Sequence, residues 1–170
     1  MLPGLTVETL QALREKLKKL GQRPSMRFPK ASLDVVEAIS TVEQYGIMCE
    51  AMYLMMAADG KVLNVEREVL RGALEILSED QVRTAHMEAM LDAASRASAT
   101  QGTERRLQAV LQTLKDEPGV KAELVVVLCA AVAVADGKLT REEQALFERL
   151  RDGLNISEER ANQLIGELLS

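Results

Sequence analysis

The chain has 170 residues, with 21 Lys or Arg against 26 Asp or Glu, so its net charge is −5. Two Phe, two Tyr and no Trp argue against binding of single-stranded nucleic acid by base stacking. One histidine and two cysteines exclude a site with several histidines or four cysteines. The longest apolar run, residues 124–135, is shorter than the roughly 20 residues of a membrane span. With no secretory signal in the first residues, we expect a cytoplasmic protein.

Apolar residues recur at helical spacing throughout, and no stretch alternates as a β-strand does, so we predict an all-α fold. The expected form is a compact bundle of about seven to eight helices. A linker with two prolines, residues 22–32, follows the first helix. The predicted helices cover about 6–21, 32–58, 64–77, 78–95, 103–117, 121–135, 140–153 and 157–169.

Several local signals refine these boundaries. Gly46 is expected to bend or split the second helix. Ser78 and Gln81 have the spacing of a capping box, and the helix that they open should fade over 95–102. Four methionines at helical spacing between positions 48 and 56 are expected in the core, and 121–135 is expected to be the central helix. Cys49 and Cys129 are expected as buried reduced thiols, with a disulfide as the alternative.

An internal repeat is the most informative feature of the sequence. Residues 57–66 read AADGKVLNVE and residues 134–143 read VADGKLTREE, 77 positions later. Each copy follows an apolar helix and precedes another helix and a serine-led acidic helix start. We therefore predict a pseudo-twofold repeat of helix, Asp-Gly-Lys turn and helix, with halves at about 47–95 and 121–170.

The acids of the two turns admit two interpretations. A carboxylate at a helix C-terminus meets the negative end of the helix dipole, so a bound cation could offset the contact. Carboxylate oxygens suit Ca²⁺ or Mg²⁺, and the candidate metal ligands are Asp59, Glu66, Asp136 and Glu143. Alternatively, the turns only punctuate helices. Thr140 and Glu143 then form a capping box, and each glycine ends a helix.

A standard EF-hand does not fit either turn. Asp-Gly followed by a glutamate matches the second half of that calcium loop. The first and third ligand positions would be Met55 and Ala57 in one copy, and Val132 and Val134 in the other. None of these side chains carries an oxygen, so the standard loop is excluded.

The stretches VAVADGKLTREEQALFERLRDGLNISEE and MAADGKVLNVEREVL resemble the TerB (tellurite-resistance) family and TerB-like domains. The resemblance covers about 33–170 and sets residues 1–32 apart as a basic helix with its linker. It implies a compact bundle of about seven or more helices with an acidic cluster for divalent cations. Family members are associated with tellurite resistance and chemical stress, and act as binding modules in larger, often membrane-linked assemblies. Asp59, Glu66, Asp136 and Glu143 match the acidic pattern.

The segment from residue 14 to residue 30 is strongly basic, at +6, which leaves −11 on the rest of the chain. It can pack its leucine stripe on the bundle, dock on an acidic partner or an anionic membrane, or neutralise the acidic face when no cation is bound. Its basic residues, which we call the N-terminal arm, are Arg14, Lys16, Lys18, Lys19, Arg23, Arg27 and Lys30.

Together these features predict a non-catalytic stress-response module that binds a divalent cation and docks a protein partner, with peripheral association at the inner face of the membrane and no nucleic acid. The alternative is a structural or adaptor protein whose acids are helix caps and whose N-terminal arm does the binding. That the protein is an enzyme is the least supported hypothesis. A di-iron bundle needs Glu-x-x-His, and Arg83 stands three residues before His86.

Overall fold

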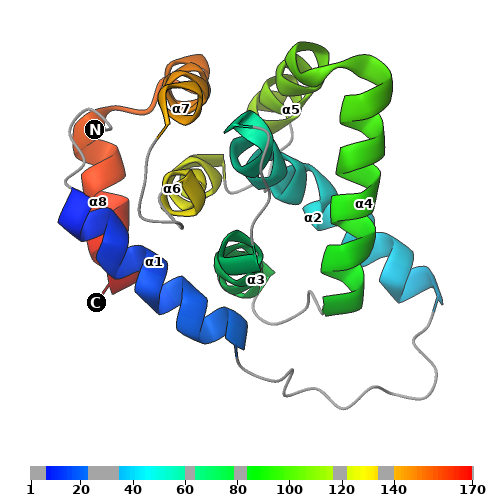
Figure 1. Ribbon diagram of the computed structural model, residues 1–170, viewed down its shortest axis with the longest axis horizontal. Coiled ribbons are helices and arrows are strands. Elements are labelled where there is room, and N and C mark those ends of the chain that lie inside the picture. The colour runs from blue at the N-terminus through cyan, green and yellow to red at the C-terminus, as the bar shows by residue number, and fades with distance from the viewer. Residues whose placement is uncertain are drawn as a thin grey trace.

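The computed structural model describes residues 7–22, 35–59, 64–78, 84–116, 122–133 and 140–169. Within these ranges the chain forms eight α-helices, one short 3₁₀ helix and no strand, which confirms the predicted all-α bundle (Figure 1). The elements are α1 (Val7–Gln22), α2 (Val35–Met56), η1 (Ala57–Asp59), α3 (Asn64–Ser78), α4 (Thr84–Gln101), α5 (Thr103–Asp116), α6 (Ala122–Ala133), α7 (Arg141–Gly153) and α8 (Glu158–Leu169).

Helix α6 lies at the centre of the bundle (Figure 1). Residues 125–133 are at most 1 % exposed, and the helix packs against α1, α2, α3, α7 and α8. After Glu123 it carries no charged residue, so every face can be buried without desolvating a charge. Its neighbour α2 runs unbroken through Gly46, so the helix is not split there; a bend at Gly46 stays a prediction. The expectation that α2's methionines are in the core is confirmed, because all four are buried.

Hydrogen bonds between residues close in sequence define the end of α7 and the start of α8. Ser157 caps α8, because its hydroxyl oxygen accepts the Arg160 N–H at 3.0 Å, as predicted. Asn155, at φ 55°, ends α7 in the left-handed conformation. The Asn155 N–H donates to the Asp152 carbonyl and the Ile156 N–H to the Arg151 carbonyl, which is the pattern of a Schellman motif. This turn sets the direction in which α8 leaves α7.

One predicted boundary of α4 is wrong. The helix continues to Gln101, whereas it was expected to fade over 95–102. Alanine, the best helix former, recurs through this stretch, and Ala94 is buried against the neighbouring helices. Ser78 is the last described residue of α3, and its hydroxyl donates to the Leu74 carbonyl at 2.6 Å. Gln81 lies outside the described residues, so its capping box with Ser78 stays a prediction.

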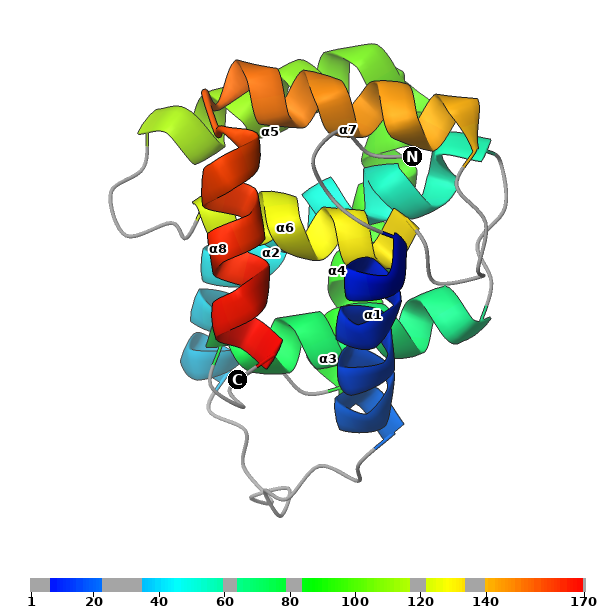
Figure 2. The ribbon, with the colours of Figure 1, turned by 90° about the vertical axis from the view of Figure 1, so that its left-hand side faces the viewer.

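Helix α1 packs chiefly against α3, and also against α6 and α8 (Figure 2). Leu10, Leu13 and Leu17 are each at most 1 % exposed, so the predicted leucine stripe is part of the same core as the other helices. A Cβ added at Gly72 would lie 1.9 Å from the Leu17 carbonyl oxygen, and one added at Gly21 would lie 1.9 Å from that of Glu68. Helix α1 extends to Gln22, one residue past Gly21, and the missing Cβ of Gly21 lets the backbones of α1 and α3 meet.

The packing has the pairings that a twofold relation between the halves would produce. Helix α2 contacts α3 and α4, as α6 contacts α7 and α8. Helix α3 contacts α6, as α7 contacts α2, and α2 contacts α6 across the centre. Equivalence of the two halves in space stays a prediction.

Both cysteines are buried and free, which confirms the expected thiols and not the disulfide. Burial, together with the nearby negative charges of Glu50 and Glu88, raises the pKa of Cys49 to about 12. Burial alone raises the pKa of Cys129. Neither thiol is poised as a nucleophile, because the reactive thiolate is disfavoured in both.

Candidate cation site at the two Asp-Gly-Lys turns

The first turn begins where α2 passes into η1. Met52, Met55 and Met56 are fully buried, so the end of α2 is anchored in the core. The chain then tightens into the 3₁₀ segment Ala57–Asp59, in which Ala58 packs against the core. Segment η1 packs against α7, and Figure 2 shows it near the end where α7 begins. The first turn of one half thus lies beside a helix of the other.

The second turn leads into α7, whose first turn carries Glu143. The Thr140 hydroxyl accepts the Glu143 N–H at 3.1 Å, and the Glu143 carboxylate accepts the Thr140 N–H at 3.0 Å through Oε1. This reciprocal capping box confirms the role predicted for Thr140 and Glu143. It satisfies two N–H groups at the start of α7.

The Glu143 side chain is buried, at only 3 % exposed. Its first-turn position also places the negative charge at the positive end of the α7 dipole. Glu143 is therefore a buried, fixed carboxylate on the same helix that η1 contacts.

The remaining predicted ligands lie outside the described side chains. The backbone of Asp59 and Glu66 is described at the end of η1 and the start of α3, but their side chains are not. All of Asp136 lies outside the described residues. Among the side chains that are described, no group of three His, Cys, Asp or Glu residues could hold a metal ion. The structure therefore brings the backbone of Asp59 towards the helix of Glu143 and leaves the four-carboxylate site a prediction.

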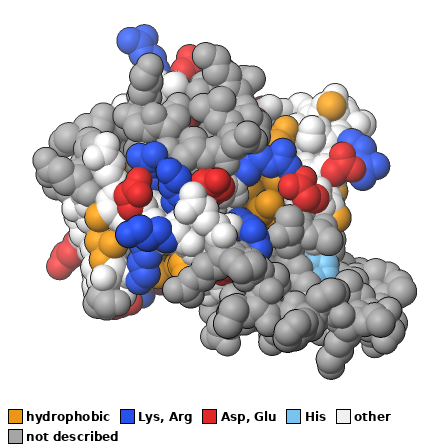
Figure 3. All heavy atoms as spheres, turned by 60° about the horizontal axis from the view of Figure 1, so that its bottom comes forward, with side chains coloured by type: hydrophobic (Ala, Val, Ile, Leu, Met, Phe, Trp, Pro, Cys, Tyr) orange, Lys and Arg blue, Asp and Glu red, His pale blue; other side chains and the backbone are white. Residues whose placement is uncertain are grey.

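The N-terminal arm is partly engaged within the molecule. The Arg14 side chain is 19 % exposed and lies 3.7 Å from Glu15, and the Lys16 ammonium donates to the Leu168 carbonyl. Lys18 is half-buried and Lys19 exposed. On the face shown in Figure 3, basic and acidic side chains lie interspersed. Arg23, Arg27 and Lys30 lie outside the described residues. Because the leucine stripe is buried, α1 presents its polar side chains to solvent, among them the acidic Glu15 and the basic Lys19.

Sequence reasoning missed a buried ion pair between α2 and α5. Glu50 is 6 % exposed, and the Arg106 guanidinium donates to it twice, through Nε at 2.7 Å and Nη2 at 2.6 Å. The bond to Glu50 raises the pKa of Arg106. A hollow of about 230 Å³ beside the pair is lined by small residues such as Gly46 and Ala94. One sequence signal could have indicated this pair. A glutamate stands inside the apolar stretch IMCEAM, and a charge buried among apolar residues requires a partner.

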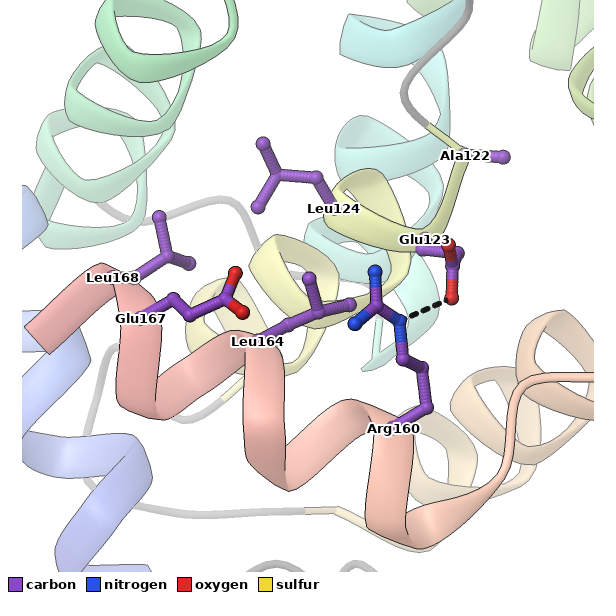
Figure 4. A pocket seen from close by; sticks show the side chains of 7 residues that line it. All are labelled: Ala122, Glu123, Leu124, Arg160, Leu164, Glu167 and Leu168. Atoms are coloured by element: carbon purple, nitrogen blue, oxygen red, sulfur yellow. Dashed lines mark hydrogen bonds and ion pairs between the residues drawn. The ribbon is translucent and has the colours of Figure 1, made fainter.

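A larger hollow of about 490 Å³ lies between α6 and α8 (Figure 4). Leu124, Leu164 and Leu168 line it, and Arg160 reaches from α8 to the Glu123 carboxylate at 2.8 Å. Arg160 thus occupies the Glu123 carboxylate that a cation would otherwise bind. Both side chains of this ion pair are more than a third exposed. This hollow therefore does not have the character of a metal site.

Comparison with known proteins identifies the architecture. The family model described as "Tellurite resistance protein TerB" matches residues 45–165, which include both Asp-Gly-Lys turns and most of the helical bundle. The chain belongs to the TerB family. Its TerB domain marks it as a tellurite-resistance-type module. Searches of curated proteins and of solved structures found no match. No helix in the part of the chain described here is long and apolar enough to cross a membrane.

Proposed function

We propose that this TerB protein is a non-catalytic stress-response module that binds one divalent cation between its two Asp-Gly-Lys turns and docks a protein partner. The ligands would be the carboxylates of Asp59, Glu66, Asp136 and Glu143. The observation that carries the proposal is the packing of η1, which ends at Asp59, against α7, which carries the buried Glu143. Hard oxygen ligands favour Ca²⁺ or Mg²⁺ over softer metals.

Thermal unfolding of the chelator-stripped protein, with and without millimolar Ca²⁺, Mg²⁺ or Mn²⁺, tests this proposal. A ligand at about 100 times its dissociation constant adds about 2.7 kcal/mol. A protein of this size gains about 2–4 °C per kcal/mol, so Tm should rise by roughly 5–10 °C. The rise should vanish in Asp59→Asn/Asp136→Asn and persist in Asp116→Asn/Asp152→Asn, which changes two exposed acids outside the turns. A cation effect equal in both double variants would refute the proposed site.

Glu143→Gln separates the ligand role from the capping role. The glutamine side-chain oxygen can still accept the Thr140 N–H, so the cap and most of its stability should remain. The negative charge is lost, so cation affinity should fall. If Glu143→Gln binds the cation as tightly as the wild type, Glu143 is only a cap.

A second candidate function rests on the capping box itself. If the acids only cap helices, the protein is a structural or adaptor module, and the N-terminal arm binds an acidic partner or an anionic membrane. Co-sedimentation with phosphatidylglycerol vesicles tests the membrane form, with Lys18→Glu/Lys19→Glu as the variant because neither side chain is fully buried. Equal sedimentation of the variant and the wild type would exclude the arm as the docking element.

The proposed location is the cytoplasm, with peripheral association at the inner face of the membrane. Two free buried thiols, Cys49 and Cys129, support a reducing compartment. Nucleic acid is not proposed as a partner, because the chain has four aromatic residues and an overall negative charge.

A further inference from the structure

The hollow of about 490 Å³ between α6 and α8 carries opposite charges at the two ends of an apolar floor. Arg160, Leu164 and Glu167 stand at positions i, i+4 and i+7 of α8, and Figure 4 shows all three side chains reaching towards α6. At 1.5 Å per residue, the two charged residues are about 10 Å apart along the helix axis. The leucine between them therefore separates a guanidinium from a carboxylate.

Three leucines from the two helices form the floor of the hollow. Leu164 is 8 % exposed, Leu124 of α6 lies opposite it, and Leu168 lies at the end of the hollow that carries Glu167 (Figure 4). Leu124 and Leu168 are partly buried and pack against the main core, so the floor is anchored. The volume falls in the range of about 300–1,000 Å³ that is typical of small-molecule sites. A short apolar chain can therefore be covered here.

Arg160 is held in a fixed orientation at its end of the floor. Its Nε donates to the Glu123 carboxylate at 2.8 Å, and its Nη1 donates to the Gln163 side-chain oxygen at 3.1 Å. The bond to Glu123, together with the charges of Glu123 and Glu167, raises the pKa of Arg160. Glu167 is therefore close enough to act on the guanidinium. The Arg160 side chain is 39 % exposed and Glu167 is exposed, so a ligand can reach both charges.

The charges of the hollow select the charges of its ligand. A purely anionic ligand at Arg160 would meet the like charge of Glu167, and a purely cationic ligand at Glu167 would meet Arg160. A ligand with one charge of each sign, separated by an apolar chain, is complementary at both ends and along the floor.

We propose that this hollow binds a ligand in which a short methylene chain joins an ammonium group to a carboxylate. The carboxylate pairs with Arg160, the ammonium pairs with Glu167, and the methylene chain covers Leu164. This is the chemistry of a free ω-amino acid and of a lysine at the C-terminus of a polypeptide. The proposal does not rest on the cation site.

Titration of the intact ¹⁵N-labelled chain with 6-aminohexanoate tests the proposal. We expect saturable shifts of the Leu164 and Glu167 amide resonances, with a dissociation constant on the order of millimolar for a ligand of this size. Hexanoate and hexylamine each keep one of the two charges. They should bind at least about 10-fold more weakly, because each loses a hydrogen bond between charged groups. Equal binding of either compound, or no saturable shift at these amides, would overturn the proposal.

Matched variants of α8 show whether Glu167 recognises the ammonium group. Glu167→Gln removes the charge of an exposed side chain and keeps its size, so the affinity for 6-aminohexanoate should fall to about that for hexanoate. Glu159→Gln removes an equally exposed charge of α8 outside the lining of the hollow and should bind as the wild type does. Equal affinities of the two variants would overturn the role of Glu167 and the proposal with it.

Two lysine derivatives distinguish the sources of this chemistry. Nα-acetyl-lysine has the same chain length as 6-aminohexanoate and carries an amide beside its carboxylate, as a C-terminal lysine does. Tighter binding of Nα-acetyl-lysine would assign the hollow to a C-terminal lysine, and tighter binding of 6-aminohexanoate would assign it to a free ω-amino acid. Nα-acetyl-lysine amide lacks the carboxylate that pairs with Arg160. If the amide bound as tightly as Nα-acetyl-lysine, the proposal would be overturned.

Discussion

The contact between α1 and α3 predicts an unusual pair of glycine-to-alanine effects. Alanine is normally the better helix former, by about 1 kcal/mol in a helix interior. Gly72→Ala should nevertheless destabilise the protein, because its Cβ would lie 1.9 Å from the Leu17 carbonyl oxygen and 2.6 Å from the carbonyl carbon. Gly46→Ala in α2 should stabilise it, because a Cβ there would meet nothing within 4 Å.

The magnitude follows from the atoms that must move. Overpacking costs about 1–3 kcal/mol when side chains can adjust. The neighbour here is helix backbone, so α1 must shift as a whole and the cost belongs at the upper end. Alanine's better helix propensity offsets part of this cost. We therefore expect Gly72→Ala to lower the free energy of unfolding by about 2 kcal/mol, which corresponds to a Tm lower by roughly 4–8 °C. Gly46→Ala should raise Tm by roughly 1–4 °C.

Differential scanning calorimetry of the two variants and the wild type measures these shifts, and hydrogen exchange locates them. In Gly72→Ala, the amides of α1 should lose protection before those of α6. If Gly72→Ala raised Tm as Gly46→Ala does, the close packing of α1 on α3 would be wrong.

Three further predictions concern other parts of the fold. Arg106→Leu should cost about 3 kcal/mol in urea unfolding, because it leaves the buried Glu50 carboxylate without its partner, and Arg106→Leu/Glu50→Leu should recover most of that loss; an undiminished loss in the double variant would contradict the pairing. Asn155→Ala should lower stability by about 1 kcal/mol through its positive φ, whereas Asn155→Gly should not, and equal losses would rule out backbone strain as the cause. Folding raises the pKa of Cys49 from 9.0 to about 12, so the thiol's contribution is complete below pH 9 and is lost as pH rises from 9 towards 12. Cys49→Ala should therefore show a shallower alkaline loss of stability than the wild type, and an unchanged slope would assign that loss to other groups.

Much of the fold could be predicted because its signals are local. The apolar run of α6 has no charged residue after Glu123, so its central position follows from composition alone. The capping box of Thr140 and Glu143 needs only residues three positions apart. One local signal was misleading: the small and polar residues of 95–101 predicted that α4 would fade, but the helix continues to Gln101.

The missed features depend on residues far apart in the sequence. In the sequence, Gly21 is typical of a helix end and Gly72 of a weak position inside a helix. Only the crossing of α1 and α3 shows that both glycines allow the two backbones to approach closely. Glu50 and Arg106 are 56 positions apart, and no pattern pairs them. For the candidate cation site, the sequence repeat predicted the residue types, whereas the contact of η1 with α7 required the fold.

The central claim is that one cation is shared by the two turns, and paramagnetic broadening by Mn²⁺ tests it most directly. The chelator-stripped protein, labelled with ¹⁵N, is titrated with Mn²⁺ while the amide resonances are followed. A shared site predicts that the amides of Ala58, beside the first turn, and Glu143, after the second, broaden together with one apparent affinity. Ca²⁺ or Mg²⁺ should reverse the broadening, and Asp59→Asn/Asp136→Asn should abolish it. Broadening of only one of these amides, or broadening spread over exposed acids such as Asp116 and Asp152, would contradict the shared site.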